Sequence, residues 1–446
     1  MNGSHRHFVA VIGAGPAGLY AAQELALQDI DVLLLNRDIR PGGLAEYGIY
    51  PEKIRMKEGL RRQFRQILEE ERITYAGNVI IGENRDVTLD DLRRLGVQAL
   101  LITVGAQGTK SLELPGENLR GVIHAKDLVY HYNLLPPFSE MKFPIGERVI
   151  IVGVGNVMAD ITRYLIYHRQ VKEVTAIARR GPAEVKFDRR EMVEAGSNFD
   201  YDAFDREIAR VAPVMQSIQQ DPEAARSFIL DAVKGALPPA STARFCLRFL
   251  SAPARIEGNE RGGVSRLVVE QTRLVLENGS VKALRTGILE ELPADTVIFA
   301  IGDRVDPGIG LPVNGLEYCI AGHPRYPVED QSYEVVDAQG KIIEDVFVAG
   351  WARKASTGMV GLAKKDGLAG AALVQRYLKS LPESQLSGDK VLSTLRAKVP
   401  GLVTNTELKR LFQVEEDEKI RRQAADFKFA TNAEMLDAIR SECRAG

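Results

Sequence analysis

Long apolar runs alternate with mixed stretches along the first half of the chain. Residues 8–12 and 30–35 form apolar runs of strand length, and the stretch between them, 19–27, is typical of a helix. The same order returns further on, where runs at 149–152 and 174–178 flank another helical stretch. A strand, a helix and a second strand in this order are typical of a mononucleotide-binding unit. The pattern therefore predicts an α/β protein with two such units.

The turn after the first strand has the sequence GAGPAG at 13–18. In a dinucleotide-binding unit the first glycine makes the tight turn, the second lets the backbone approach a pyrophosphate, and the third lets helix and strand pack closely. The helix that follows adds unpaired N–H groups and a positive dipole end. A plain strand–turn–helix is the alternative, and a second strand ending at Asn36, where a ribose-binding acid belongs, weighs against it. The expected cofactor contacts in this turn are Gly13, Gly15, Pro16, Ala17 and Gly18.

Another glycine-rich segment, 37–51, follows the second strand. Adjacent glycines beside a proline suggest a backbone that runs close to a ligand, where a Cβ would clash. A surface loop is the alternative, but the apolar and aromatic residues of this segment would be unnecessary in a solvated loop. The candidate cofactor contacts in and next to this segment are Asn36, Arg37, Gly43, Leu44, Tyr47 and Gly48. Gly105, at the end of a later apolar strand, is a further candidate.

The second unit repeats the glycine turn with Gly153 and Gly155, but its second strand ends in Arg179 and Arg180 instead of Asn36. An acid at this position favours the free 2′-hydroxyl of NAD or FAD, whereas arginine accommodates the 2′-phosphate of NADP. A guanidinium binds phosphate through two parallel hydrogen bonds. Two surface arginines at a strand end are the alternative. We therefore interpret the first site as an FAD site and the second as an NADP(H) site.

A last apolar strand, 346–351, runs into the segment 352–360 and a helix at about 362–378. A helix N-terminus there can face the pyrimidine edge of a flavin, whose reduced anion is favoured by nearby N–H groups. Beyond a linker at 380–389, the charged tail 390–446 predicts two or three helices.

Composition narrows the class of protein. The 446 residues carry a formal charge of −2, so no general affinity for nucleic acid or anionic membranes is expected. Three widely spaced cysteines, Cys246, Cys319 and Cys443, argue against a cysteine-ligated cluster, a zinc site or an adjacent redox dithiol, and no metal is expected. No apolar stretch approaches 18 residues, and the start of the chain lacks the apolar core of a signal peptide. A cytoplasmic protein without a transmembrane segment is therefore expected.

From about residue 8 to 380, these segments resemble the adrenodoxin reductase family of FAD-dependent ferredoxin–NADP reductases. They are also similar, more distantly, to the small subunit of glutamate synthase. The turn 153–157 with Asp160 looks like the family's NADP loop, and the run 179–182 with Glu191 looks like its 2′-phosphate arginines and the glutamate near the nicotinamide.

The resemblance implies catalytic roles for Glu191 and Asp160. It implies cofactor contacts from Gly153, Gly155, Asn156, Val157, Arg179, Arg180, Glu191, Gly350, Trp351, Thr357, Gly358, Met359 and Val360. The segment 247–249, with Arg244 close by, resembles part of the surface that receives the iron–sulfur partner.

Three positions depart from the family pattern. Asn36 stands where most members have glutamate, so a weaker hold on the ribose is expected. Lys53 stands where adrenodoxin reductases have a histidine near the flavin, so a proton relay through this position is not expected. Met158 occupies a usually small position, so a looser contact between helix and strand is expected. The tail beyond 385 is not expected to belong to the common core.

The resemblance and the paired sites together imply two Rossmann-like dinucleotide-binding domains, the NADP domain being inserted into the FAD domain, plus a helical C-terminal extension. The expected boundaries are 1–110 with 320–380 for the FAD domain, 111–319 for the NADP domain and 381–446 for the extension. The implied activity is transfer of electrons between NADPH and a ferredoxin-like iron–sulfur protein through flavin N5. A reductase subunit of a larger synthase or dehydrogenase complex, docked through the extension, and a structural or regulatory flavoprotein-like subunit remain alternatives.

Overall fold

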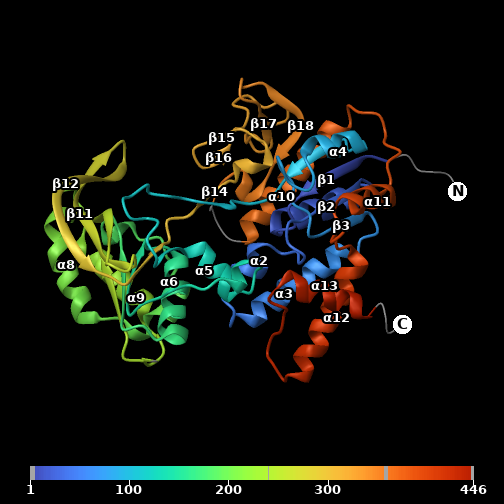
Figure 1. Ribbon diagram of the computed structural model, residues 1–446. Coiled ribbons are helices and arrows are strands. Elements are labelled where there is room, and N and C mark those ends of the chain that lie inside the picture. The colour runs from blue at the N-terminus through green and yellow to red at the C-terminus, as the bar shows by residue number, and fades with distance from the viewer. Residues whose placement is uncertain (1–5, 240, 356–359, 443–446) are drawn as a thin grey trace. The chain divides into compact units, whose positions relative to one another are not determined.

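The structure is a computed structural model that describes residues 6–239, 241–355 and 360–442 (Figure 1). These residues divide into two compact units. The first takes the described residues up to Thr109, Tyr130–Glu140 and those from Gly302 onward. The second comprises Lys110–Val129 and Met141–Ile301, as far as they are described. Each unit contains a largely parallel sheet of its own, which confirms the predicted α/β class.

The sheet of the first unit has the strand order β17-β18-β4-β1-β2-β3. Its neighbours pair in parallel except β17 and β18. The strands are β1 (Phe8–Ile12), β2 (Asp31–Leu35), β3 (Ile73–Ala76), β4 (Ala99–Ile102), β17 (Glu334–Val336) and β18 (Ile342–Val348). In β1, Val9 and Val11 enter one hydrophobic core, whereas Ala10 and Ile12 enter another. A strand buried on both faces must be apolar throughout, and this is why the sequence shows a continuous run.

Helices cover both faces of this sheet. Those of the first 109 residues are α1 (Pro16–Leu27), α2 (Leu44–Tyr47), α3 (Ile54–Leu68) and α4 (Leu89–Leu95), whereas the residues of α5 (Ala125–Tyr132) are divided between the two units. Helix α10 (Val360–Leu378) crosses α1 closely, because a Cβ on Gly367 would lie only 2.2 Å from the carbonyl oxygen of Ala17. Two short antiparallel pairs are β5 (Gly108–Thr109) with β14 (Asp303–Arg304) and β15 (Val313–Asn314) with β16 (Glu317–Tyr318).

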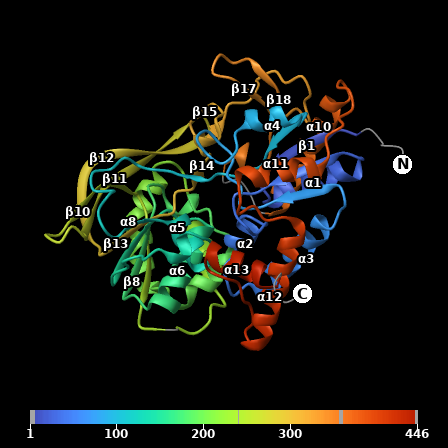
Figure 2. The ribbon, with the colours of Figure 1, turned by 45° about the vertical axis from the view of Figure 1, so that its right-hand side comes forward.

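The C-terminal tail is helical, as predicted, and it packs into the first unit. Its helices are α11 (Gly388–Lys398), α12 (Asn405–Arg421) and α13 (Asn432–Glu442). Leu411 of α12 and Met435 of α13 are buried in the core that contains α1, and Leu395 of α11 is buried in the other core. Figures 1 and 2 show the red helices α12 and α13 beside the blue helix α3. The tail therefore completes both cores of the first unit.

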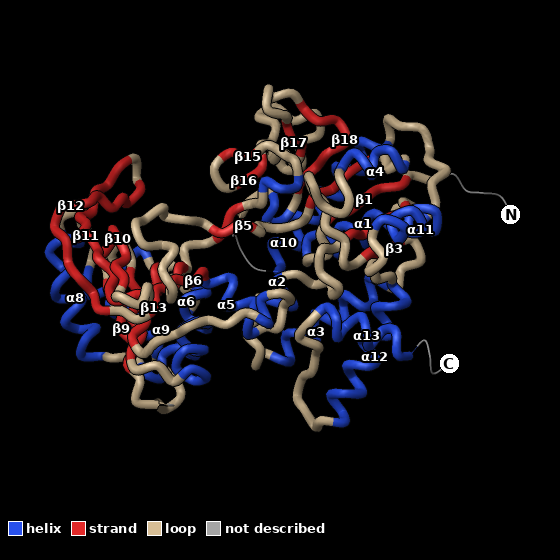
Figure 3. The backbone as a smooth tube through the Cα atoms, in the orientation of Figure 1, coloured by secondary structure: helices blue, strands red, loops and turns tan. Residues whose placement is uncertain are grey.

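The sheet of the second unit has the order β6-β13-β7-β8-β9 and is parallel throughout. The strands are β6 (Val122–His124), β7 (Arg148–Val152), β8 (Glu173–Ile177), β9 (Arg244–Arg248) and β13 (Thr296–Phe299). The helices are α6 (Asn156–Tyr164), α7 (Arg189–Ala195), α8 (Tyr201–Gln216) and α9 (Pro222–Val233). A separate antiparallel sheet, visible in Figure 3, consists of β10 (Ser251–Gly258), β11 (Val264–Glu277) and β12 (Ser280–Pro293).

Candidate cofactor sites

The first glycine turn connects β1 to α1, and its three glycines have different surroundings. A Cβ on Gly18 would lie 1.9 Å from the carbonyl oxygen of Gly13, and one on Gly13, whose φ is +110°, would lie 2.6 Å from that of Thr103. A Cβ on Gly15 would meet nothing within 4 Å. Glycine is thus required by internal packing at Gly13 and Gly18, whereas Gly15 borders open space. The Thr103 hydroxyl donates to the carbonyl oxygen of Gly13 at 2.8 Å, a support that the sequence pattern gave no reason to expect.

The N-terminus of α1 is free for an anion. Gly15 is the N-cap, Pro16 occupies the first turn, no side chain caps the helix and no acid lies in its first turn. The N–H groups of a helix start and the positive end of its dipole favour a phosphate at such a place. The geometry fits the pyrophosphate of a dinucleotide.

Asn36, at the end of β2, ties two loops together. Its Oδ1 accepts a hydrogen bond from the N–H of Ala14 at 3.1 Å, and its Nδ2 donates to the carbonyl oxygens of Asp38 and Arg40 at 2.9 and 3.0 Å. The side chain is buried. A glutamate cannot donate these hydrogen bonds, and this explains the departure from an acid at this position. One lone pair of Oδ1 remains for a ribose hydroxyl.

The glycine pair 42–43 packs against the first turn. The N–H of Gly42 donates to the carbonyl oxygen of Ala14 at 2.7 Å, and a Cβ on Gly43 would lie 3.1 Å from Cα of Gly15. The segment then enters α2, where Tyr47 is buried and Leu44 is half-buried. These contacts agree with the interpretation of this segment as backbone at a ligand site, and they exclude a loosely solvated loop. Arg37 pairs with Asp38 at the surface, with Nε and Oδ1 3.0 Å apart.

Strand β18 leads to Gly350 and Trp351, and an aspartate of α10 fixes this turn. The N–H of Gly350 donates to Oδ2 of Asp366 at 2.6 Å, and Arg353 forms an ion pair with the same carboxylate. Sequence reasoning missed Asp366, because a single acid in a helix gives no signal of a contact 16 residues away. Gly105 has a φ of +72°. The proposed contacts Thr357, Gly358 and Met359 lie outside the described residues, and Val360 begins α10.

The second glycine turn, between β7 and α6, has the same arrangement. A Cβ on Gly153 would lie 2.3 Å from the carbonyl oxygen of Ala300, whereas a Cβ on Gly155 would meet nothing within 4 Å. Gly155 is the N-cap of α6, again without a capping side chain. Asn156 instead accepts a hydrogen bond from the N–H of Asp188 at 2.6 Å and donates to its carboxylate at 2.7 Å. Val157, the next predicted contact, is exposed.

Met158 directly follows Val157 and is fully buried. It accepts a weak hydrogen bond through its sulfur from the hydroxyl of Thr162 at 3.5 Å. Met158 was expected to loosen the contact between α6 and β7, but its side chain is not exposed to solvent.

Arg179 and Arg180 follow the end of β8, as the sequence predicted. Among the described residues neither forms an ion pair with a carboxylate, and Nε of Arg180 is buried without a hydrogen-bond partner. A buried guanidinium N–H without an acceptor is costly unless a ligand supplies one. The two side chains therefore fit a phosphate group. Asp160 and Glu191 lie on α6 and α7, which pack against each other.

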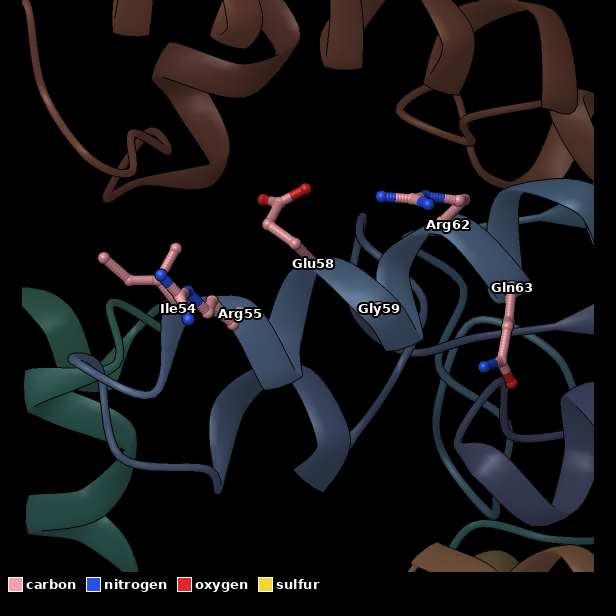
Figure 4. Close-up of a pocket in the computed structure, with 6 residues that line it drawn as sticks. All are labelled: Ile54, Arg55, Glu58, Gly59, Arg62 and Gln63. Atoms are coloured by element: carbon pink, nitrogen blue, oxygen red, sulfur yellow. The ribbon is translucent and has the colours of Figure 1, made fainter.

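The segment around β9 that resembles a partner surface differs in its free charge from the basic helix α3. On β9, Arg244 pairs with Asp200 at 2.8 Å and Arg248 pairs with Glu290. The basic helix α3 is more than a solvated face, because Lys57 and Arg61 are buried. Its exposed side borders a cavity of about 490 Å³ lined by Ile54, Arg55, Glu58, Gly59, Arg62 and Gln63. Figure 4 shows Glu58 and Arg62 pointing outward from the same side of α3.

Comparison with known proteins supports this interpretation of both units. A profile of the family described as "Pyridine nucleotide-disulphide oxidoreductase" matches residues 7–212. The "NADPH-ferredoxin reductase FprA" of Mycobacterium leprae is 29% identical over 449 residues, which cover 91% of this chain and 92% of that protein. The mitochondrial "NADPH:adrenodoxin oxidoreductase" of Homo sapiens is 27% identical over 427 residues, covering 87% and 82% of the two chains.

A solved structure extends the match to the tail. "Mycobacterium tuberculosis FprA in complex with NADPH" superposes with a TM-score of 0.81 at 26% identity, covering 97% of this chain and 99% of that one. A match of this extent includes most of the residues beyond 385, so the expectation that the tail lies outside the common core was wrong. No helix in the described ranges is long and apolar enough to cross a membrane. The chain is thus similar along nearly its whole length to NADPH-ferredoxin and adrenodoxin reductases.

Proposed function

We propose that the protein is an FAD-dependent reductase that carries electrons between NADPH and a one-electron iron–sulfur acceptor such as ferredoxin. The observation that carries this proposal is the pair of open glycine turns, of which only the second is followed by two arginines without a carboxylate partner among the described residues. Two dinucleotide sites with different preferences at the ribose fit one FAD and one NADP(H).

The first unit is the proposed FAD-binding part, and it contains nearly all of the predicted FAD domain, 1–110 with 320–380, as well as the tail helices. FAD, when bound there, would supply the chemistry that converts the two-electron hydride of NADPH into single electrons. The N-terminus of α1 holds the pyrophosphate, and the backbone of Gly15 and Gly43 lets it come close. Asn36 holds the turn and offers its remaining lone pair to the ribose. Asp366 fixes the Gly350–Trp351 turn, whose backbone would help to hold the flavin.

The second unit is the proposed NADP-binding part, and it contains most of the predicted NADP domain, 111–319, except 130–140 and 302–319. Arg179 and Arg180 bind the 2′-phosphate, and the N-terminus of α6 receives the pyrophosphate. Asn156 orders the segment before α7 through its two hydrogen bonds with Asp188. Glu191 and Asp160 are proposed to orient the nicotinamide end of the coenzyme.

Replacement of both Arg179 and Arg180 by Ala tests the coenzyme assignment. The Michaelis constant for NADPH should rise about a hundredfold or more while that for NADH changes little, because charge-assisted hydrogen bonds are worth roughly 1.5–3 kcal/mol each and about 1.4 kcal/mol corresponds to tenfold. Replacement of Arg206 and Arg261, two exposed arginines of the second unit, by Ala is the matched control. Equal losses with both coenzymes would mean that Arg179 and Arg180 serve the fold.

The acceptor is proposed to dock on the exposed face of α3, where Arg55 and Arg62 have no ion-pair partner among the described residues. Iron–sulfur proteins of the ferredoxin type are commonly acidic, and exposed charges speed such an encounter. Arg244 and Arg248, which also resembled a docking surface, are already paired with carboxylates.

Reversal of the charges of Arg55 and Arg62 to Glu should slow reduction of an acidic ferredoxin and remove most of its dependence on salt. The reason is screening, since the Debye length falls from about 10 Å at 0.1 M salt to about 3 Å at 1 M. Reduction of a small neutral quinone by NADPH should stay unchanged. If the double variant reduces ferredoxin normally while Arg244→Glu with Arg248→Glu does not, the acceptor docks on the second unit instead.

A reductase subunit of a larger complex, as in glutamate synthase, is the second candidate. The tail was the segment that made this alternative attractive, and its residues Leu395, Leu411 and Met435 are instead buried in the first unit. A cytoplasmic location is proposed for either candidate.

A further inference from the structure

A cluster of buried charges connects the tail to the loop that packs against the first glycine turn. We call it the tail cluster. It consists of Arg40, Glu46, Lys57 and Arg61 from the first part of the chain and Glu415, Asp426 and Lys428 from the tail. Six of these side chains are buried, and that of Asp426 is 22% exposed.

Glu46 is the centre of the tail cluster. Arg61 donates to both of its carboxylate oxygens at 2.7 Å, and Nζ of Lys428 donates to Oε1 at 2.9 Å. Arg61 also donates to Asp426 at 2.8 Å. Nearby, Arg40 forms an ion pair with Glu415. Two tail residues therefore reach the Glu46–Arg61 pair, and a third reaches Arg40.

The charges of this cluster depend on one another. Burial alone would raise the pKa of Glu46, but Lys428, Arg61 and Arg40 outweigh it and hold this pKa well below its ordinary value. Asp426 is likewise kept ionised, because Arg61 lowers its pKa against the effect of burial. Removal of one member of a buried ion pair leaves an uncompensated charge, which is strongly destabilising locally.

The tail cluster holds both ends of the loop from Arg40 to Tyr47. At one end, the carbonyl oxygen of Arg40 accepts a hydrogen bond from Asn36, which also binds the N–H of Ala14. At the other end, Lys428 lies 4.6 Å from the ring centroid of Tyr47. Between the two ends, the N–H of Glu46 donates to the carbonyl oxygen of Gly43 at 3.0 Å, and a Cβ on Gly42 would lie 3.0 Å from Cβ of Glu46, so Glu46 packs closely against the glycine pair.

We propose that residues 415–428 of the tail position the first dinucleotide site, with Glu415, Asp426 and Lys428 holding the loop 40–47 against the glycine turn in the conformation that FAD requires. This inference rests on the assignment of FAD to the first unit. The three tail residues are positioning residues, because they act through Arg40, Arg61 and Glu46. A tail that served stability alone would not require buried charges that converge on this loop, since apolar side chains of similar size stabilise a core at least as well.

The test uses the holoenzyme and the substitutions Lys428→Met and Asp426→Asn. The rate of FAD dissociation, followed by the rise in fluorescence of released FAD, should increase roughly tenfold in Lys428→Met, within the range for coupling between distant groups. A smaller increase is expected in Asp426→Asn, which leaves the Lys428–Glu46 pair intact. Binding of NADP⁺, which belongs to the second unit, should not change. Asp437→Asn, at an exposed ion pair of α13 outside residues 415–428, is the control and should release FAD at the wild-type rate.

Two further comparisons separate the outcomes. If Lys428→Met fails to fold, the milder Asp426→Asn still decides, and unchanged FAD dissociation in that folded variant would overturn the inference. The variant Lys428→Arg, which keeps the charge, should restore slow FAD release; equal release by the Met and Arg variants would mean that the side chain acts through packing. If the wild-type protein binds no FAD at all, the proposed function itself is wrong. If the wild type binds FAD and the variants release it at the same rate, only the inference about the tail is wrong.

Discussion

Lys57 is a buried cation whose environment makes the stability of the protein dependent on pH. Its Nζ donates to Oδ1 of Asn133 at 2.6 Å, and its side chain is almost inaccessible to water. Burial, assisted by the positive charges of Lys428 and Arg61 and opposed by Glu46 and Asp426, lowers the pKa of Lys57 from 10.5 to about 7. Below pH 7 the folded and unfolded states both carry the proton, so the full cost of burying the ammonium is present. Between about pH 7 and 10.5 only the unfolded state keeps it, so stability rises with pH there.

The free energy of unfolding of Lys57→Met should therefore exceed that of the wild type most at low pH. Its advantage in unfolding free energy should shrink as pH rises above 7, by at most about 1.4 kcal/mol per pH unit. Urea unfolding of both proteins at pH 6 and pH 9 measures the difference. Lys390→Met, on the exposed side of α11, is the control and should show no such trend. A constant difference between Lys57→Met and wild type at the two pH values would show that Lys57 keeps its charge in the fold.

At the scale of elements, the two glycine turns were predictable because their signal is local. A strand buried on both faces, a glycine that must bend the chain and a helix start without a capping side chain all lie within a few residues of one another. Thr103 and Asp366, which support the turns, were not predictable, because each contacts a segment far away in sequence. The amide of Asn36 was noticed as a departure, but its role in joining the Ala14 and Arg40 segments depends on tertiary packing.

In the second glycine turn, Gly153 has no room for a Cβ whereas Gly155 borders open space, and this difference gives a prediction for the NADP site. Gly155 has an extended backbone and open space around its Cβ position, so Gly155→Ala should fold and melt like the wild type. The added methyl group occupies the place where the pyrophosphate approaches, so NADPH affinity should fall by roughly 1–3 kcal/mol. FAD content should be unchanged. Calorimetric titration with NADP⁺ measures the loss, and undiminished affinity would place the coenzyme away from this turn.

For the whole molecule, the sequence pattern predicted the α/β class and the two repeated units, because each unit contains its own apolar strands and its own glycine turn. It misjudged the tail, whose charged composition resembles that of a free helical extension. Enough apolar positions, among them Leu395, Leu411 and Met435, are present to complete the two cores of the first unit, and several of the charges are buried in pairs. Composition alone does not distinguish a charge that faces water from one that meets a buried partner.

Anaerobic reaction of the purified protein with NADPH and an excess of oxidised [2Fe–2S] ferredoxin tests the central claim most directly. The protein should contain one FAD and reduce about two ferredoxins for each NADPH consumed, because the coenzyme delivers two electrons and each cluster accepts one. NADH should support the reaction far less well, since it lacks the phosphate that Arg179 and Arg180 bind. A protein that binds no flavin, or one that oxidises NADPH and leaves the ferredoxin oxidised, would contradict the account.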